Sequence, residues 1–128
     1  MLYSLGRFDQ AEKVCHEILH RIDSGMVGYE GTSGRYAAFF LGQIHESRKN
    51  LEEAKKYYSL CVRYAEAIGV TESGYYLYSL IALGEIAQKE GRKSDAKKYF
   101  RKVKDKADRG EDAFKDAKKK LKKLEKGD

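Results

Sequence analysis

The chain has 128 residues, of which 41% are hydrophobic and 36% charged, so one folded domain with its own core is expected and disorder is excluded by composition. No stretch approaches the roughly 20 apolar residues that span a bilayer, and the N-terminal residues lack the organisation of a secretion signal, so we expect neither. The net charge is +6 and uneven, since residues 91–128 hold 16 Lys and Arg against 8 Asp and Glu.

The regular elements expected from the sequence are all helices. Proline is absent, and apolar residues recur at spacings of three and four, which places them on one face of a helix. No segment alternates with period two, so no sheet is expected. In chain order, the predicted helices span residues 1–5, 8–23, 33–48, 51–68, 72–90, 94–107 and 111–126.

Turn residues separate the predicted helices. The breaks between paired helices are expected at Leu5-Gly6-Arg7, Arg48-Lys49-Asn50 and Glu90-Gly91-Arg92, and Gly25 to Gly34 is the one long loop. Asn50 is the predicted N-cap of the helix that follows it, with Glu53 completing a capping box, and Lys93 or Ser94 begins the later helix.

The apolar framework repeats along the chain. One copy contains Ala38, Leu41, Gly42, His45, Leu51, Ala54, Tyr58 and Cys61. Adding 42 to these positions gives Leu80, Leu83, Gly84, Ala87, Lys93, Ala96, Phe100 and Val103, and subtracting 43 from the later ones gives Phe8, Ala11, Cys15 and Ile18. Such units bury a continuous core only by stacking. Ala54 and Ala96 are expected at close helix contacts, and Gly42 and Gly84 where a neighbouring helix packs against the backbone.

This framework resembles the tetratricopeptide repeat, on Leu41-Gly42, Ala54 and Tyr58 and on Leu83-Gly84, Gly91, Ala96 and Phe100. Gly6, Phe8 and Ala11 match in a truncated first copy. The resemblance implies an all-α fold of antiparallel helix hairpins, stacked as a right-handed superhelix (an α-solenoid) with a C-terminal capping helix. It departs from the family in a repeat of 42–43 residues rather than about 34, and in lacking the closing proline.

We therefore expect one domain over residues 1–128. Its parts are a truncated first repeat at 1–24, a second repeat at 33–68, a third at 72–107 and a capping helix at 111–126. Phe114, Ala117, Leu121 and Leu124 form the apolar stripe of that last helix. The truncated first copy suggests either a piece of a larger repeat protein or a second copy of the chain covering the N-terminal repeat.

The resemblance implies a non-catalytic protein-interaction module, a scaffold or adaptor, which binds a peptide or partner helix in a concave groove. Carried over position by position, the groove residues are Tyr36, Phe39, Gln43, Tyr78, Ile81, Glu85, Lys119, Lys122 and Lys123. Exposed aromatic residues often anchor partners, and the alternative is that these residues fill the space between long helices. The partner would be a protein or peptide, and no cofactor or metal is expected.

Two other functions remain open. The lysine-rich C-terminal helix could bind nucleic acid or an acidic partner, although an amphipathic capping helix explains the same residues. His16-Glu17-Ile18-Leu19-His20 satisfies H-E-x-x-H, the pattern of a zinc-dependent hydrolase. However, the repeat register turns Cys15, Ile18 and Leu19 inward and leaves His16, Glu17 and His20 toward solvent, and a third ligand such as Glu46 is not specified.

The two cysteines, Cys15 and Cys61, bear on the compartment. They are far apart in a chain whose core needs no crosslink, so we expect reduced, buried thiols, with a disulfide as the alternative. Together with the absence of a signal, this favours a cytoplasmic protein.

Overall fold

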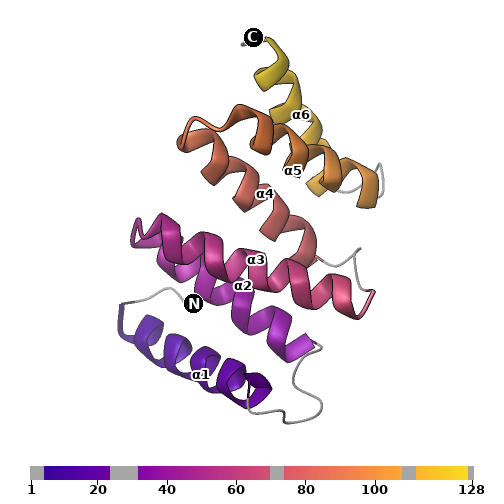
Figure 1. Ribbon diagram of the computed structural model, residues 1–128. Coiled ribbons are helices and arrows are strands. Elements are labelled where there is room, and N and C mark those ends of the chain that lie inside the picture. The colour runs from indigo at the N-terminus through magenta and orange to yellow at the C-terminus, as the bar shows by residue number, and fades with distance from the viewer. Residues whose placement is uncertain (1–4, 24–31, 70–73, 108–111, 127–128) are drawn as a thin grey trace. The chain divides into compact units, whose positions relative to one another are not determined.

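The computed structural model describes residues 5–23, 32–69, 74–107 and 112–126, and every regular element in these ranges is an α-helix (Figure 1). The helices are α1 (Leu5–Asp23), α2 (Thr32–Ser47), α3 (Leu51–Ala67), α4 (Gly74–Lys89), α5 (Lys93–Lys106) and α6 (Asp112–Lys126). The predicted bounds of α2, α3 and α5 are correct to within one residue at each end. Residues 1–4 and 24–31, which include parts of a predicted helix and of the predicted loop, lie outside the described ranges.

The chain divides into two compact units, Met1–Gly69 and Val70–Asp128. In the first unit, α2 packs against both α1 and α3; in the second, α5 packs against α4 and α6, and α4 also contacts α6. Each unit therefore contains one complete helix hairpin and one further helix, which confirms the predicted all-α helical-repeat fold. The single domain over 1–128 and the hand of the superhelix stay predictions.

A glycine–aromatic contact holds each hairpin together. A Cβ atom added to Gly42 would lie 2.7 Å from the ring of Tyr58, and one added to Gly84 would lie 2.7 Å from the ring of Phe100. Real Cβ atoms do not come this close to other carbons. The two glycines thus allow an aromatic ring from the second helix to rest on the backbone of the first, as the sequence predicts.

The remaining framework residues surround this contact. Ala54 and Ala96, one turn before the aromatic residues, are fully buried, as are Cys61 and Val103 one turn after them. The register breaks down at the edges of the hairpin, where His45 and Leu51 are half-buried and Lys93 is exposed. The apolar seam of each hairpin is therefore built from the predicted positions.

The two hairpin turns share one backbone geometry. After α2, the Lys49 N–H bonds to the Glu46 carbonyl and the Asn50 N–H to the His45 carbonyl, at 3.0 and 2.8 Å. After α4, Gly91 and Arg92 bond to Gln88 and Ala87 at 3.1 and 2.8 Å. This is the Schellman motif, which satisfies helix-end carbonyls and requires a left-handed residue. Lys49 (φ 62°) and Gly91 (φ 78°) occupy that position.

Two local predictions are wrong. The break at Leu5-Gly6-Arg7 does not exist, because α1 begins at Leu5 and continues without interruption to Asp23. A glycine inside a helix costs only about 1 kcal/mol relative to alanine, so it does not by itself end a helix. Asn50 is at the N-cap position of α3, but its side chain makes no capping hydrogen bond, so the predicted capping box is absent. The backbone of Asn50 is already committed to the Schellman turn, with ψ at 75°.

Helix α6 packs on the second unit through a stripe of small and apolar residues. Ala113, Ala117, Leu121 and Leu124 are buried, and Phe114 is half-buried with the Lys104 ammonium 6.0 Å from its ring centroid. Asp112 in its first turn complements the helix dipole. The predicted capping helix thus covers the predicted third repeat, with Ala113 as an additional contact.

The glycine–aromatic contact predicts the outcome of adding one methyl group. Gly84→Ala should lower the free energy of unfolding by about 1–2 kcal/mol, because overpacking against Phe100 costs about 1–3 kcal/mol and alanine's helix propensity returns about 0.5–1 kcal/mol. Urea denaturation would measure the change. Gly74→Ala is the matched control, because its new Cβ would lie 4.0 Å from the nearest side-chain atom, on Tyr78, and should leave stability equal or higher. Equal losses in both variants would contradict this packing.

The hairpin turns predict opposite effects of exchanging lysine and glycine. Lys49→Gly should raise the free energy of unfolding by about 0.5–1 kcal/mol. A non-glycine residue at positive φ costs about 1–2 kcal/mol, and the extra backbone entropy that glycine loses on folding costs somewhat less than that. Gly91→Lys should lower stability by a similar amount. A Cβ at Gly91 would meet no atom within 4 Å, so steric overlap could not explain that loss. Thermal unfolding followed by circular dichroism measures both changes, and shifts in the same direction would contradict the turn geometry.

Candidate functional site

Three of the predicted groove residues, Tyr36, Phe39 and Gln43, lie on α2 in the first unit and are half-buried. The ring of Tyr36 packs against that of Phe40 with centroids 4.5 Å apart, and the ring of Phe39 meets Tyr58 edge-on at 6.0 Å. Both aromatic side chains therefore contribute to packing inside this unit and keep part of their surface in solvent.

The corresponding residues of the second unit, Tyr78, Ile81 and Glu85 on α4, differ strongly in exposure. Tyr78 is 42% exposed, Glu85 is half-buried and Ile81 is only 3% exposed. Ile81 stands at the register position of Phe39, but it offers a partner almost no surface. Within this set, Tyr78 is the residue with a large accessible ring.

The three predicted lysines, Lys119, Lys122 and Lys123, are exposed on α6. They lie among the buried stripe residues along the helix, so they occupy the solvent side of an amphipathic helix. Lys115 and Lys118 are exposed as well, and Lys120 is half-buried with its ammonium 3.2 Å from the Asp116 carboxylate. The second unit therefore carries a basic surface on α6.

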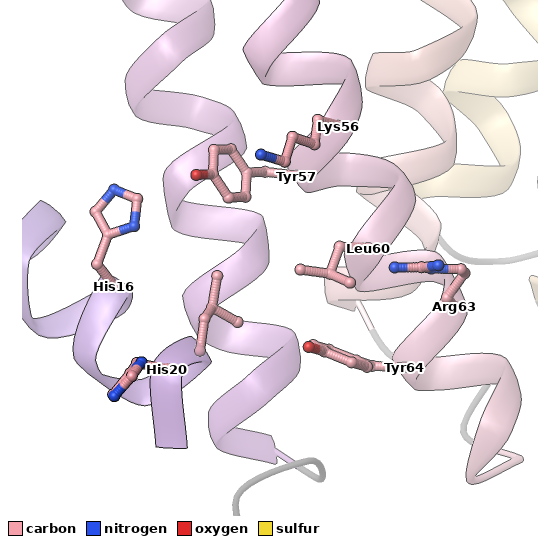
Figure 2. A pocket seen from close by; sticks show the side chains of 8 residues that line it. His16, His20, Lys56, Tyr57, Leu60, Arg63 and Tyr64 are labelled. Atoms are coloured by element: carbon pink, nitrogen blue, oxygen red, sulfur yellow. The ribbon is translucent and has the colours of Figure 1, made fainter. Parts of the chain in front are cut away.

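A cleft that the sequence did not predict lies in the first unit, between α1 and α3 (Figure 2). It has a volume of about 580 Å³. Its lining comprises His16, Leu19 and His20 from α1 and Lys56, Tyr57, Leu60, Arg63 and Tyr64 from α3. We call it the α1–α3 cleft, and it contains none of the predicted groove residues.

The comparisons with known proteins bear on the same helices. The family model of the tetratricopeptide repeat matches residues 36–68 and 77–105, which contain nearly all of the hairpins α2–α3 and α4–α5. The chain belongs to the tetratricopeptide repeat family. No curated protein matches it significantly, and no solved structure does. The two tetratricopeptide matches coincide with the two nearly complete copies in the sequence.

Outside the matched tetratricopeptide segments, α1 carries the H-E-x-x-H pattern. His16, Glu17 and His20 are exposed, Cys15 and Leu19 are buried and Ile18 is half-buried, as the repeat register predicts. Glu46, the suggested third ligand, instead accepts a hydrogen bond of 2.7 Å from the Tyr58 hydroxyl. In the described ranges, no three His, Cys, Asp or Glu side chains are grouped so as to hold a metal ion.

A polar cluster centred on Glu12 connects the three helices of the first unit. The Glu12 carboxylate accepts hydrogen bonds of 3.2 Å from Arg48, just after α2, and lies 3.7 Å from Nε2 of His45. The His45 ring in turn stacks on the ring of Tyr57 at 5.5 Å. The pKa of Tyr57 is raised by burial and, to a smaller extent, by the charges of Glu53 and Glu12. The cluster fixes Tyr57 at the edge of the cleft.

Three further expectations concern membrane-spanning helices, the cysteines and self-association. No helix in the described part of the chain is both long and apolar enough to cross a membrane. Cys15 and Cys61 are buried thiols that form no disulfide with each other, in agreement with the sequence prediction. Val14 on α1 is 53% exposed. Self-association through this part of the chain stays a prediction.

The buried thiol of Cys15 predicts slow alkylation. Burial, with a smaller effect of the Glu12 charge, raises its pKa from 9.0 to about 11, so at about pH 8 the thiolate is about a hundredfold scarcer than in the unfolded chain. Iodoacetamide labelling of the Cys15 peptide, followed by mass spectrometry, should therefore be at least that much slower in buffer than in urea. Since the folded-state pKa is the higher one, the corresponding stability is complete below about pH 9 and is lost as the pH rises toward 11. Equal labelling rates would contradict the burial.

Proposed function

We propose that this chain recognises protein or peptide partners through the exposed face of the first helix of each hairpin, α2 in one unit and α4 in the other. Tetratricopeptide repeats are generally protein–protein interaction modules and typically non-catalytic scaffolds, which supports this class of function. The residues of these faces are Tyr36, Phe39 and Gln43 on α2, and Tyr78 and Glu85 on α4.

The observation that carries the proposal is the exposure of Tyr78. Helix α4 is otherwise strongly apolar, and ten of its sixteen residues are buried. Tyr78, on the same helix, is 42% exposed, so its side chain makes less contact with the core than it would in an inward-facing position. A tyrosine combines a large apolar ring with a hydroxyl group and few rotatable bonds, so it gains more from burial under a partner than most side chains.

The polar residues of these faces define the chemistry of the partner. Gln43 and Glu85, one turn beyond Phe39 and Ile81, are half-buried beside their aromatic or aliphatic neighbours. An extended or helical segment could place an apolar side chain on each tyrosine and direct polar groups toward the amide and the carboxylate. Ile81 is buried, so it is not part of the proposed surface, although its register position predicted it there.

A specific observation supports a second candidate function, the binding of acidic partners or nucleic acid by α6. Lys115, Lys118, Lys119, Lys122 and Lys123 are all exposed on this one helix. Their positive charge would attract phosphates or carboxylates, and such binding would weaken steeply as salt is added. The same lysines also keep an amphipathic helix solvated, and therefore we rank this function second.

Tyr78→Ala tests the principal proposal. Proteins captured by the immobilised chain from a lysate of its source would be quantified for wild type, Tyr78→Ala and Tyr36→Ala. Loss of a central aromatic contact should weaken capture of a true partner about 5- to 30-fold, which corresponds to about 1–2 kcal/mol. Because Tyr78 is exposed, the far-ultraviolet circular dichroism of that variant should match wild type.

Two controls separate the candidate functions. Tyr99→Ala makes the same truncation on α5, the second helix of the hairpin, and should leave capture unchanged. A variant with Lys119, Lys122 and Lys123 changed to Glu removes the basic surface of α6. Partners that survive both tyrosine substitutions but are lost from the glutamate variant would reject the α2 and α4 faces in favour of the second candidate.

A further inference from the structure

The α1–α3 cleft has a composition that the repeat architecture does not explain. The two complete repeats are related by an offset of 42, so α5 shows which side chains the equivalent face of a second helix requires. Lys56 and Tyr57 correspond to Lys98 and Tyr99, which are the same residue types. Leu60, Arg63 and Tyr64, in contrast, correspond to Lys102, Asp105 and Lys106. The leucine, guanidinium and tyrosine are thus particular to α3.

The floor of the cleft is apolar and continuous with the core of the first unit. Leu19 on α1 is 8% exposed and belongs to the core cluster that also includes Cys15, Leu41 and Tyr57. Leu60 and Tyr64 of α3 are partly buried against the same cluster. A ligand in the cleft would therefore contact apolar surface that is already held rigidly by core packing.

The rim of the cleft is basic. Arg63 and Lys56 lie on α3, His16 and His20 lie on α1, and none of the described residues that line the space is acidic. Figure 2 shows the guanidinium of Arg63 extending toward Leu60 and the hydroxyl groups of Tyr57 and Tyr64 pointing from α3 toward α1. The Lys56 ammonium lies 5.4 Å from the Tyr57 ring centroid. On α1, Glu12 is bound to Arg48 and lies 4.0 Å from His16.

We propose that the α1–α3 cleft is a second binding site, which takes an acidic peptide segment of a partner protein, with a large apolar side chain next to a carboxylate. The apolar side chain lies on Leu19, Leu60 and the tyrosine rings. The carboxylate pairs with Arg63, whose planar guanidinium can form two parallel hydrogen bonds to it. This site is on different residues from the proposed faces of α2 and α4 and does not depend on them.

A short synthetic peptide of Glu, Leu and Phe is the probe for this site. Added to the full-length, isotope-labelled chain, it should shift the backbone amide resonances of α1 and α3 and leave those of α5 and α6 in place. Arg63→Asp, which introduces the residue type that α5 has at the equivalent position, should raise the dissociation constant about tenfold or more, since loss of a charge-assisted pair costs about 1.4 kcal/mol or more.

Arg101→Asp is the matched control, because Arg101 is an exposed arginine on α5 and the substitution changes the net charge equally. It should alter the dissociation constant less than twofold. Arg63→Lys keeps the charge but loses the paired hydrogen bonds, and should fall between wild type and Arg63→Asp. Arg63 is exposed, so all three variants should retain the wild-type circular dichroism.

Four results would overturn the proposal. They are an absence of shifts in α1 and α3, equal weakening by Arg63→Asp and Arg101→Asp, equal binding of a peptide with lysine in place of glutamate, and shifts of α1 and α3 by a short RNA but not by the acidic peptide. The last result would assign the cleft to nucleic-acid phosphates instead.

Discussion

The fold of each unit depends on the contact between a glycine backbone and an aromatic ring. Gly42 with Tyr58, and Gly84 with Phe100, bring the two helices of a hairpin closer than any side chain at the glycine would allow. The small residues Ala54 and Ala96 permit the same approach one turn earlier, since both are fully buried. This spacing fixes where the second helix must begin, and the left-handed residues Lys49 and Gly91 make the turn short enough to reach it. The other contacts of the hairpin follow from that geometry.

The sequence predicts the seam of the hairpins because the spacing of apolar residues reports which face of a helix is buried. It fails where the outcome depends on competing local bonds. Asn50 has the side chain of an N-cap, yet its backbone takes part in the preceding turn and its side chain caps nothing. Gly6 resembles the turn glycine at position 91, but in the described structure α1 runs through it. A glycine marks a turn only where helix-end bonds such as those of Gly91 also form.

The family pattern identifies which residues of the two hairpins are equivalent, but it does not predict how exposed each side chain is. Phe39 and Ile81 are equivalent, yet the first is half-buried and the second is almost fully buried. The spacing of apolar residues does not predict the α1–α3 cleft, for a related reason. The spacing indicates which face of α3 a residue is on, but not that α1 leaves an open space opposite that face. The signal that could have found the cleft is the mismatch between the copies, with Leu60 and Arg63 at positions that hold Lys102 and Asp105.

The chain contains two hairpins of the same fold, so equivalent residues can be compared to separate those that packing requires from the others. The glycine, alanine and aromatic positions of the seam agree between the copies, and their burial is explained by packing. At positions where the two copies differ, the shared packing does not require one particular residue type. Tyr58 shows that such differences also occur in the core. Its hydroxyl donates to Glu46 at 2.7 Å, whereas Phe100 and the exposed Gln88 stand at the equivalent positions. The second hairpin is complete without that bond, so a polar pair found in only one copy is not required by the packing that the copies share.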